Sequence, residues 1–431
     1  MSDIQKYVRF LCYSMRPNVK NGASKEQWVS NISFDEQEAV DLATIDREIF
    51  QPFKRDHRYI SVDAVRLLAK QSLPRMVFDF ADGGAETEGT MRRNESAFDD
   101  LKFLPRPMGG SLNRDLSIDL FGTRLSLPVI IGPTGFAGLF WPHGELAAAN
   151  AAHAAGTAYV MSHASTVTIE GLAREAKGQK WFQNFIYKDR GLTRSFSERA
   201  SQSGYSAMVV TIDNQVPGFR ERDVRSGFVV PPRLSLKNAA DVITHPAWVF
   251  RMLKTPKVTF ANYASAKHAS VMALSAYMAS NLNPDVSWDD LDEIRAYWPK
   301  RLLVKGVMHP LDAVEAIERG ADGIIVSNHG GRQLDGALST IEALPAIVEA
   351  VAGRVPVLLD GGVRRGADVV RAIALGASAC LIARPQLWGL ASGGTDGVRQ
   401  VLEIYRSEID RVLALCGLKK ISDINTSCLK L

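Results

Sequence analysis

The sequence predicts an α/β protein, a TIM (β/α)8 barrel with a long insertion after the fourth strand and an N-terminal extension. Three observations predict it. Eight short apolar runs alternate with segments of helical character, an unusually long segment separates the fourth run from the fifth, and the first 57 residues differ in character from the rest.

The eight expected strands are apolar along nearly their whole length. They are LPVIIGP from Leu127, AYVMS from Ala158, WFQNFI from Trp181, SAMVVTID from Ser206, RLLVKG from Arg301, GIIVSN from Gly323, VPVLLDGG from Val355 and ACLIA from Ala379. Continuous apolar strands separated by helices are typical of a parallel sheet that is buried on both faces. Eight such units fit a closed barrel, and an open, doubly wound sheet is the alternative that the pattern leaves open.

Two segments fall outside this repeat. The stretch from about Asn214 to Lys300 is far longer than an ordinary connection, and long insertions tend to be lids or interaction surfaces. Residues 1–57 are mixed and polar, with a weak helical pattern around Ser33–Phe50. We therefore expect two parts, an extension over residues 1–57 and a barrel domain over residues 58–431. From Val62 the barrel part begins with helical periodicity that ends at a Gly-Gly break.

Composition excludes several classes of protein. The chain has 431 residues, 46% hydrophobic and 23% charged, and its net charge of +4 is small with no long basic run, so nucleic acid is not an expected partner. Its four cysteines lack the spacing of a disulfide framework or a metal site, which indicates a reducing compartment and no metal. The sequence contains no apolar run of about 18 residues, so no membrane span is predicted. The expected location is the cytoplasm.

Polar residues stand where a barrel enzyme needs them. At the carboxyl ends of the expected strands lie Pro133, Gln183, Asp213, Lys305, His329 and Asp360. Barrel active sites are built at that end.

The segment SNHGGRQLDG follows the sixth strand and combines an imidazole with a guanidinium. Abstraction of a proton from an alcohol needs a base that titrates near neutrality, which suits His329. A carboxylate needs a bidentate donor, which suits Arg332. Asp213, at the end of the fourth strand, is a candidate to orient His329, with a loop cap as the alternative.

The segment LLDGGVRRGADVV predicts a strand, a glycine turn and a helix. Backbone amides at such a helix start, together with Arg364, form an anion site, and Arg384 after the eighth strand supplies a second cation. Lys305 ends an apolar strand and needs an anionic partner, either a reduced flavin or a carboxylate.

SNHGGRQLDG, LLDGGVRRG, LLVKG, IGPTG and the FADGGAE segment together resemble the family of FMN-dependent 2-hydroxy acid dehydrogenases and oxidases, which includes glycolate oxidase, L-lactate dehydrogenase and mandelate dehydrogenase. The resemblance covers about Tyr59 to Ile424 and implies FMN as the cofactor. It makes His329 the base, Asp213 its partner, and Arg332 and Arg220 the carboxylate binders. The cofactor contacts that it implies are Pro133, Thr134, Gly135, Ser162, Gln183, Thr211, Lys305, Ser327, Asp360, Gly362, Arg364 and Arg384.

Two positions depart from the family pattern. The tyrosines that the family uses at the substrate fall at Phe80 and Phe185, so both hydroxyls are missing. Each lost hydrogen bond to a charged substrate is worth about 1.5–3 kcal/mol, and two phenyl rings favour a bulky or aromatic substrate. Gly135 is more typical of the dehydrogenases than of the oxidases.

The resemblance implies oxidation of an L-2-hydroxy acid to the 2-oxo acid, with His329 as base and hydride transfer to flavin N5, on a bulky, mandelate-like substrate. The alternatives are oxidation or oxidative decarboxylation of a modified biosynthetic intermediate, and a non-catalytic flavin-binding protein. The implied electron acceptor is a quinone, another carrier or oxygen. A homo-oligomer, by resemblance a tetramer, and peripheral contact of the insertion with the inner face of a membrane are further expectations.

Overall fold

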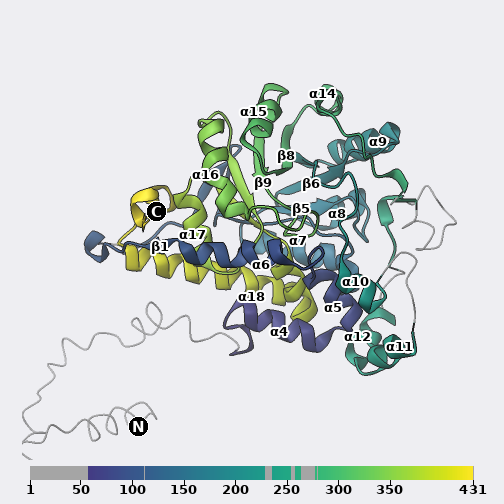
Figure 1. Ribbon diagram of the computed structural model, residues 1–431. Helices are drawn as coiled ribbons and strands as arrows, with labels where there is room; N and C mark the ends of the chain where they lie inside the picture. The colour runs from purple at the N-terminus through teal and green to yellow at the C-terminus, as the bar shows by residue number, and fades with distance from the viewer. Residues whose placement is uncertain are drawn as a thin grey trace, which may run out of the picture. The chain divides into compact units, whose positions relative to one another are not determined.

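Eight parallel strands close a barrel at the centre of the molecule (Figure 1). The structure, a computed structural model, describes residues 57–110, 112–228, 235–253, 258–263, 277–278 and 280–430. The barrel strands are β4 (Val129–Ile131), β5 (Tyr159–Ser162), β6 (Lys180–Phe185), β7 (Ala207–Thr211), β8 (Arg301–Val307), β9 (Gly323–Val326), β10 (Val357–Asp360) and β11 (Ala379–Ile382). Because β11 pairs with β4, the sheet is closed, which confirms the predicted barrel and excludes the open sheet.

Each barrel strand is followed by a helix, as the alternation in the sequence predicts. These helices are α7 (Gly144–Ala154), α8 (Ile169–Glu175), α9 (Arg190–Gln202), α14 (Trp288–Tyr297), α15 (Pro310–Glu318), α16 (Thr340–Val351), α17 (Gly366–Ala374) and α18 (Arg384–Cys416). Local signals start several of them: Thr168 caps α8 by accepting from Gly171 N, and Ser339 with Glu342 forms a capping box on α16.

The helical stretch from Val62 is two helices. They are α4 (Val62–Ser72) and α5 (Arg75–Asp82), separated at Leu73 and Pro74. Proline lacks the N–H that a helix interior requires and disfavours the α conformation in the residue before it, so the chain turns there. α6 (Gly89–Ser96) follows the Gly-Gly break, and α4 lies along α18 (Figure 1).

The inside of the barrel has two layers, because every second residue of a strand points inward. The apolar layer consists of Ile130, Val160, Trp181, Val209, Leu303, Ile325, Leu358 and Leu381. Two positions further along six of these strands, the residue is polar: Ser162, Gln183, Thr211, Lys305, Ser327 and Asp360. The strand period therefore brings six side chains from distant parts of the chain to the carboxyl end of the barrel.

A hairpin closes the opposite end of the barrel. Its strands, β2 (Ile118–Leu120) and β3 (Thr123–Leu125), are antiparallel, and Leu120 and Leu125 join the apolar layer. A Cβ on Gly323 would lie only 2.9 Å from Cζ of Phe121, the residue in the hairpin turn. The amino end of the barrel is thus packed, and the carboxyl end is left for a site.

The insertion between β7 and β8 holds α10 (Glu221–Ser226), α11 (Leu236–Ile243) and α12 (Pro246–Leu253), besides α14. α14 contacts α9 and α15, so it takes the place of a barrel helix and the true insertion is shorter than the sequence suggests. α10 and α11 contact α5 at the edge of the barrel unit (Figure 1).

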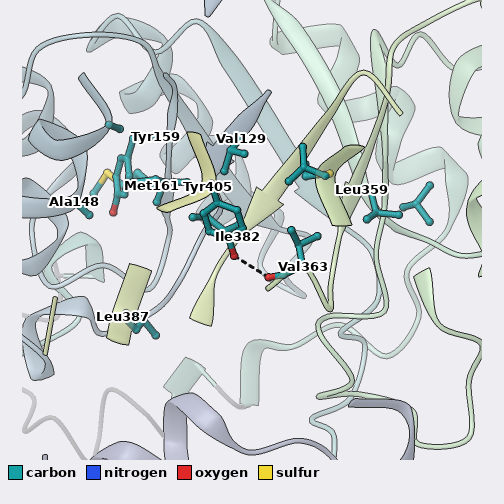
Figure 2. Packing of buried hydrophobic residues seen from close by; sticks show 14 of the residues in the cluster. Val129, Ala148, Tyr159, Met161, Leu359, Val363, Ile382, Leu387 and Tyr405 are labelled. Carbon is teal, nitrogen blue, oxygen red and sulfur yellow. Dashed lines mark hydrogen bonds between the residues drawn. The ribbon is translucent and has the colours of Figure 1, made fainter. Parts of the chain in front are cut away.

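Helix α18 braces the turn that follows β10. Figure 2 shows Tyr405 of α18 beside Val363, and the tyrosine hydroxyl donates to the Val363 carbonyl at 2.9 Å. Val363 lies next to Gly362 and Arg364, two of the expected cofactor contacts. A buried helix therefore fixes the expected anion-binding turn.

The described residues include no helix that is both long enough and apolar enough to cross a membrane. A short antiparallel pair joins β12 (Leu429–Lys430), at the carboxyl end of the described chain, to β1 (Lys102–Phe103), which follows α6. The expected extension over residues 1–57, with its weak helical pattern, lies outside the described residues apart from His57, and it stays a prediction.

Candidate active site

A cavity of about 690 Å³ opens at the carboxyl ends of the barrel strands. Apart from Asp213 and Ser327, all of the predicted site residues line it: Phe80, Pro133, Thr134, Gly135, Ser162, Gln183, Phe185, Thr211, Arg220, Lys305, His329, Arg332, Asp360, Gly362, Arg364 and Arg384. Asp213 and Ser327 contact lining residues directly, as described below. The structure therefore brings the predicted residues together at one place.

His329 and Asp213 form a hydrogen-bonded pair, with Nδ1 of the imidazole 2.8 Å from Oδ1 of the carboxylate. Burial would raise the pKa of Asp213, but the charge and hydrogen bond of His329 and the positive charge of Lys305 outweigh it, so the pKa lies below its usual value. An ionised Asp213 favours the proton on Nδ1, which leaves Nε2 of His329 as the base.

The turn that presents His329 has a left-handed backbone. His329 has φ 57°, and Gly330 and Gly331 follow with φ 65° and 70°. A left-handed histidine is uncommon and is held only where surrounding contacts require it. Here Asn328 and Asn94 exchange two amide hydrogen bonds of 2.8 Å each.

Lys305 is 4% exposed and lies between two oxygens, the Ser327 hydroxyl and Asp360 Oδ2, both at 2.9 Å. Ser327 Oγ in turn donates to the same carboxylate oxygen at 2.7 Å. Burial would lower the pKa of Lys305, but Asp360 and Asp213 raise it above its usual value. The sequence left two anionic partners open for Lys305, a carboxylate and a reduced flavin. In the structure Lys305 has the carboxylate partner, Asp360, and it also lines the cavity, where a flavin could lie beside it.

Gln183 has a defined amide orientation. Its Nε2 lies 3.1 Å from the carbonyl oxygen of Asn184, which can only accept a hydrogen bond, so that atom is the NH₂ group. The same nitrogen donates to Thr211 Oγ1 at 3.1 Å, and Oε1 accepts from Ser162 Oγ at 3.1 Å. Three strand-end side chains thus form one connected polar edge of the cavity.

Oε1 of Gln183 also lies 3.1 Å from Nδ1 of His163, a residue that the sequence analysis missed. Because Oε1 is an acceptor, the proton of this imidazole is on Nδ1, and its buried Nε2 has no hydrogen-bond partner in the part of the chain that the structure describes. Burial lowers the pKa of His163 to about 3. The ring packs against Phe185, with centroids 4.1 Å apart. Nothing in the sequence around His163 separates it from an ordinary core residue.

Replacing His163 by phenylalanine should flatten the pH dependence of folding. In the unfolded chain the imidazole titrates near about 6.5, whereas the folded protein keeps it neutral down to about 3. Stability is therefore unaffected above the unfolded pKa and falls as pH drops below it, by about 1.4 kcal/mol per unit. Urea unfolding of both proteins at a series of pH values tests this, and an unchanged slope in the variant would contradict it.

Arg332 is a half-buried cation on the cavity wall that forms no ion pair with any carboxylate of the described residues. Its Nη1 donates to the Gly83 carbonyl at 2.7 Å, and its guanidinium lies 5.5 Å from the centroid of the Phe80 ring. Burial, with the charges of Arg220 and Arg384, holds the pKa of Arg332 well below its usual value. Such a group favours binding of an anion in the cavity.

Arg220, the other expected carboxylate binder, is already paired. Its Nε lies 2.7 Å from Oδ2 of Asp223, and both residues line the cavity. Asp223 was not among the predicted site residues. The pattern ERDV on a short helix is ordinary in a sequence, so only the fold reveals that this carboxylate faces the site.

The predicted anion end of the cavity carries two arginines. Arg384 is 8% exposed, and its guanidinium donates to the carbonyls of Ala81, Gly83 and Gly330 at 3.1, 2.8 and 2.9 Å. Burial and the charge of Arg364 lower the pKa of Arg384 to about 10. Arg364 forms an ion pair with Glu95 at 2.7 Å.

The residues present fit FMN. Two hydrogen-bonded groups of strand-end side chains offer donors and acceptors, as the edge of a flavin ring requires: Ser162 with Gln183 and Thr211, and Lys305 with Ser327 and Asp360. Arg384, which has no carboxylate partner among the described residues, and the Gly362 turn lie at the other end, where a phosphate needs cations and backbone amides. Lys305 would lie beside the ring, and the two arginines would bind the phosphate.

Two residues of the SNHGGRQLDG motif, Gln333 and Asp335, stabilise loops around the site, a role that the sequence did not reveal. Gln333 donates to the carbonyls of Asp213 and Val216 at 2.8 and 3.1 Å, which joins the start of the insertion to the His329 turn. Asp335 accepts from the backbone amide of Thr90 at 2.7 Å at the start of α6. The motif therefore supports the site as well as forming it.

Comparison with known proteins bears on what this site does. The family model for FMN-dependent dehydrogenase matches residues 69–431. The chain is 42% identical over 369 residues to an L-lactate oxidase of Nostoc sp., which covers 84% of this chain and 96% of that protein. It is 40% identical over 370 residues to (S)-mandelate dehydrogenase of Pseudomonas putida, covering 86% and 93%. A crystal structure described as the monotopic membrane protein (S)-mandelate dehydrogenase has a TM-score of 0.84 at 39% identity, covering 86% of this chain and 99% of that one.

Proposed function

Since the chain belongs to the family of FMN-dependent 2-hydroxy acid dehydrogenases and oxidases, we propose that it oxidises a bulky or aromatic L-2-hydroxy acid. FMN-dependent oxidation of L-2-hydroxy acids is the shared activity, and it sets aside a non-catalytic flavin-binding protein. The relatives divide between lactate and mandelate, so the size of the substrate is our proposal. The observation that carries it is the apolar wall around Phe80 and Phe185.

The proposed reaction follows from charges in the cavity. Arg332, with Arg220, binds the carboxylate, and His329 removes the hydroxyl proton through Nε2 while Asp213 stabilises the imidazolium that forms. FMN supplies the acceptor for the hydride that leaves the α-carbon. The order in which the two hydrogens leave is open, but both orders need the same base.

Aromatic rings surround both departures from the family tyrosines. The Phe80 ring lies 4.5 Å from the Phe228 ring and 6.1 Å from the Phe136 ring, measured between centroids. The Phe185 ring lies 6.1 Å from the Tyr187 ring. An aromatic side chain of the substrate gains from such a wall by burial and by ring contacts. A methyl group, as in lactate, fills little of it.

Restoring the tyrosines should therefore change substrate preference. With Phe80→Tyr and Phe185→Tyr combined, we expect kcat/KM for lactate to rise by about tenfold or more, because two hydrogen bonds to the substrate return. Mandelate regains the same bonds but loses apolar contact with the two rings, so its kcat/KM should rise less. Steady-state kinetics on lactate and mandelate test this, with Phe228→Tyr as the control for a hydroxyl added elsewhere on the wall. Lactate preferred by the unmodified protein would contradict the proposal.

The electron acceptor stays a prediction. Gly135 lines the cavity, and a Cβ there would lie 3.2 Å from Cβ of Ala164, so alanine at this position would crowd the wall. By resemblance, glycine favours the dehydrogenases, and we expect the reduced protein to use a quinone or another carrier rather than oxygen.

We also propose that α11 and α12 contact a membrane surface. Neither helix has a buried residue, and Leu236, Ile243, Phe250 and Leu253 are between 65% and 92% exposed. Two hydrogen bonds hold this helix pair to the barrel domain. The Arg75 backbone amide donates to Asp241 Oδ2 at 2.6 Å, and Trp248 Nε1 donates to the Leu139 carbonyl at 2.8 Å. Large exposed apolar side chains on helices of this kind suit the interface of a bilayer.

Co-sedimentation with vesicles of mixed zwitterionic and anionic phospholipid tests membrane contact. We expect the protein to bind, and we expect Ile243→Ser combined with Phe250→Ser to reduce the bound fraction several-fold. Leu311→Ser, which removes an equally exposed leucine on α15, is the matched control and should bind as the parent does. Equal sedimentation of all three proteins would contradict the proposal.

A further inference from the structure

Asp223 is a buried carboxylate on the wall of the cavity. It lies in the first turn of α10, is 5% exposed and accepts from Arg220 Nε at 2.7 Å through Oδ2. Its other oxygen, Oδ1, is buried and has no hydrogen-bond partner among the described residues. A carboxylate oxygen without a partner is costly to bury, so this placement requires an explanation beyond an ordinary surface ion pair.

The charges around the substrate position can be counted. Arg332 and Arg220 contribute two positive charges and Asp223 one negative charge, so the group carries one net positive charge. One substrate carboxylate balances that charge. A second carboxylate on the same substrate would have no cation left and would face Asp223 inside a cavity whose other walls are largely apolar. Burying an unpaired charge beside a like charge is unfavourable.

We propose that Asp223 is a specificity-determining residue that rejects 2-hydroxy acids with a second negative charge. The inference rests on the proposed function, because it concerns the substrate of that same site. It also argues against a substrate whose carboxylate is masked, since a neutral ligand would leave the charge of Arg332 unbalanced. Discrimination by a repulsive group is a general way to separate similar ligands.

The test replaces Asp223 by asparagine, which keeps the shape and removes the charge. Substrates are compared in pairs that differ in charge at one position: 4-carboxymandelate with 4-methylmandelate, and malate with 2-hydroxybutyrate. The readout is the second-order rate constant for anaerobic flavin reduction in the full chain with FMN bound. We expect the ratio of diacid to monoacid to rise about tenfold or more in Asp223→Asn. The control is Glu221→Gln, which removes a partly exposed charge from the same helix and should leave the ratio unchanged; Glu221 pairs with Arg225.

An unchanged ratio in Asp223→Asn, or an equal rise in Glu221→Gln, would overturn the inference. Inhibition of the unmodified protein tests the inference even if the variant does not fold. We expect 4-carboxyphenylacetate to inhibit about tenfold more weakly than 4-methylphenylacetate, and equal inhibition would overturn the inference too. If no 2-hydroxy acid reduces the flavin, the proposed function fails instead, and binding of the two phenylacetates, followed by the flavin spectrum, still reports the charge preference.

Discussion

Replacing His329 by alanine will abolish flavin reduction by 2-hydroxy acids while FMN stays bound. His329 is the only group of the described site whose pairing with an ionised carboxylate, Asp213 at 2.8 Å, leaves a free base nitrogen. Removal of a positioned general base costs about 10²–10⁴-fold in rate. Anaerobic stopped-flow measurement of flavin reduction gives the rate, and the flavin absorbance of the purified protein gives the FMN content.

The matched control is His153→Ala, which removes an exposed histidine from α7 and should reduce at the parental rate. Loss of FMN together with activity in His329→Ala would contradict the account, because the residue would then support the cofactor site. Activity within about threefold of the parent would contradict the role of His329 as base.

Arg332→Met will lower kcat/KM for hydroxy acids about 30-fold to several thousandfold and will not destabilise the fold. Loss of the buried partner of a bound carboxylate costs about 2–5 kcal/mol. In the absence of substrate, however, Arg332 is a half-buried cation that has no ion pair among the described residues, so its replacement by an apolar side chain is neutral or stabilising. Steady-state kinetics and thermal unfolding of the same preparation separate the two effects.

Arg332→Lys sharpens this prediction. Lysine keeps the charge but not the planar fork, so we expect only partial recovery of kcat/KM. A fall in thermal stability of Arg332→Met that parallels the loss of activity would contradict the account. In that case the hydrogen bond from Arg332 to Gly83 would be the main role of the guanidinium.

Most of the barrel and its ring of polar residues could be predicted because both follow from local sequence. Lys305 and Asp360 each follow an apolar run in a barrel strand, and alternation along a strand fixes which face each presents. Closure of the sheet then brings them within 2.9 Å, although 55 residues separate them in the chain. Alternation along each strand and the closed topology of the sheet were therefore enough to predict this part of the site.

The rest depended on tertiary packing. His163 is neutral because the surrounding core buries it, and no signal near it in the sequence distinguishes it. Asp223 faces the cavity only because α10 packs on α5. The length of the insertion was overestimated from the sequence, because no local sequence signal separates α14, a barrel helix, from the helices of the insertion before it.

The most direct test of the central claim is anaerobic mixing of the purified protein, with FMN bound, with L- and D-forms of hydroxy acids from glycolate to mandelate and larger aryl acids. We predict that the L-forms bleach the flavin absorbance, that aryl acids do so faster than lactate or glycolate, and that the D-forms do not. Absence of bleaching by every acid, in protein that holds FMN, would contradict the account and would direct the search to a modified biosynthetic intermediate.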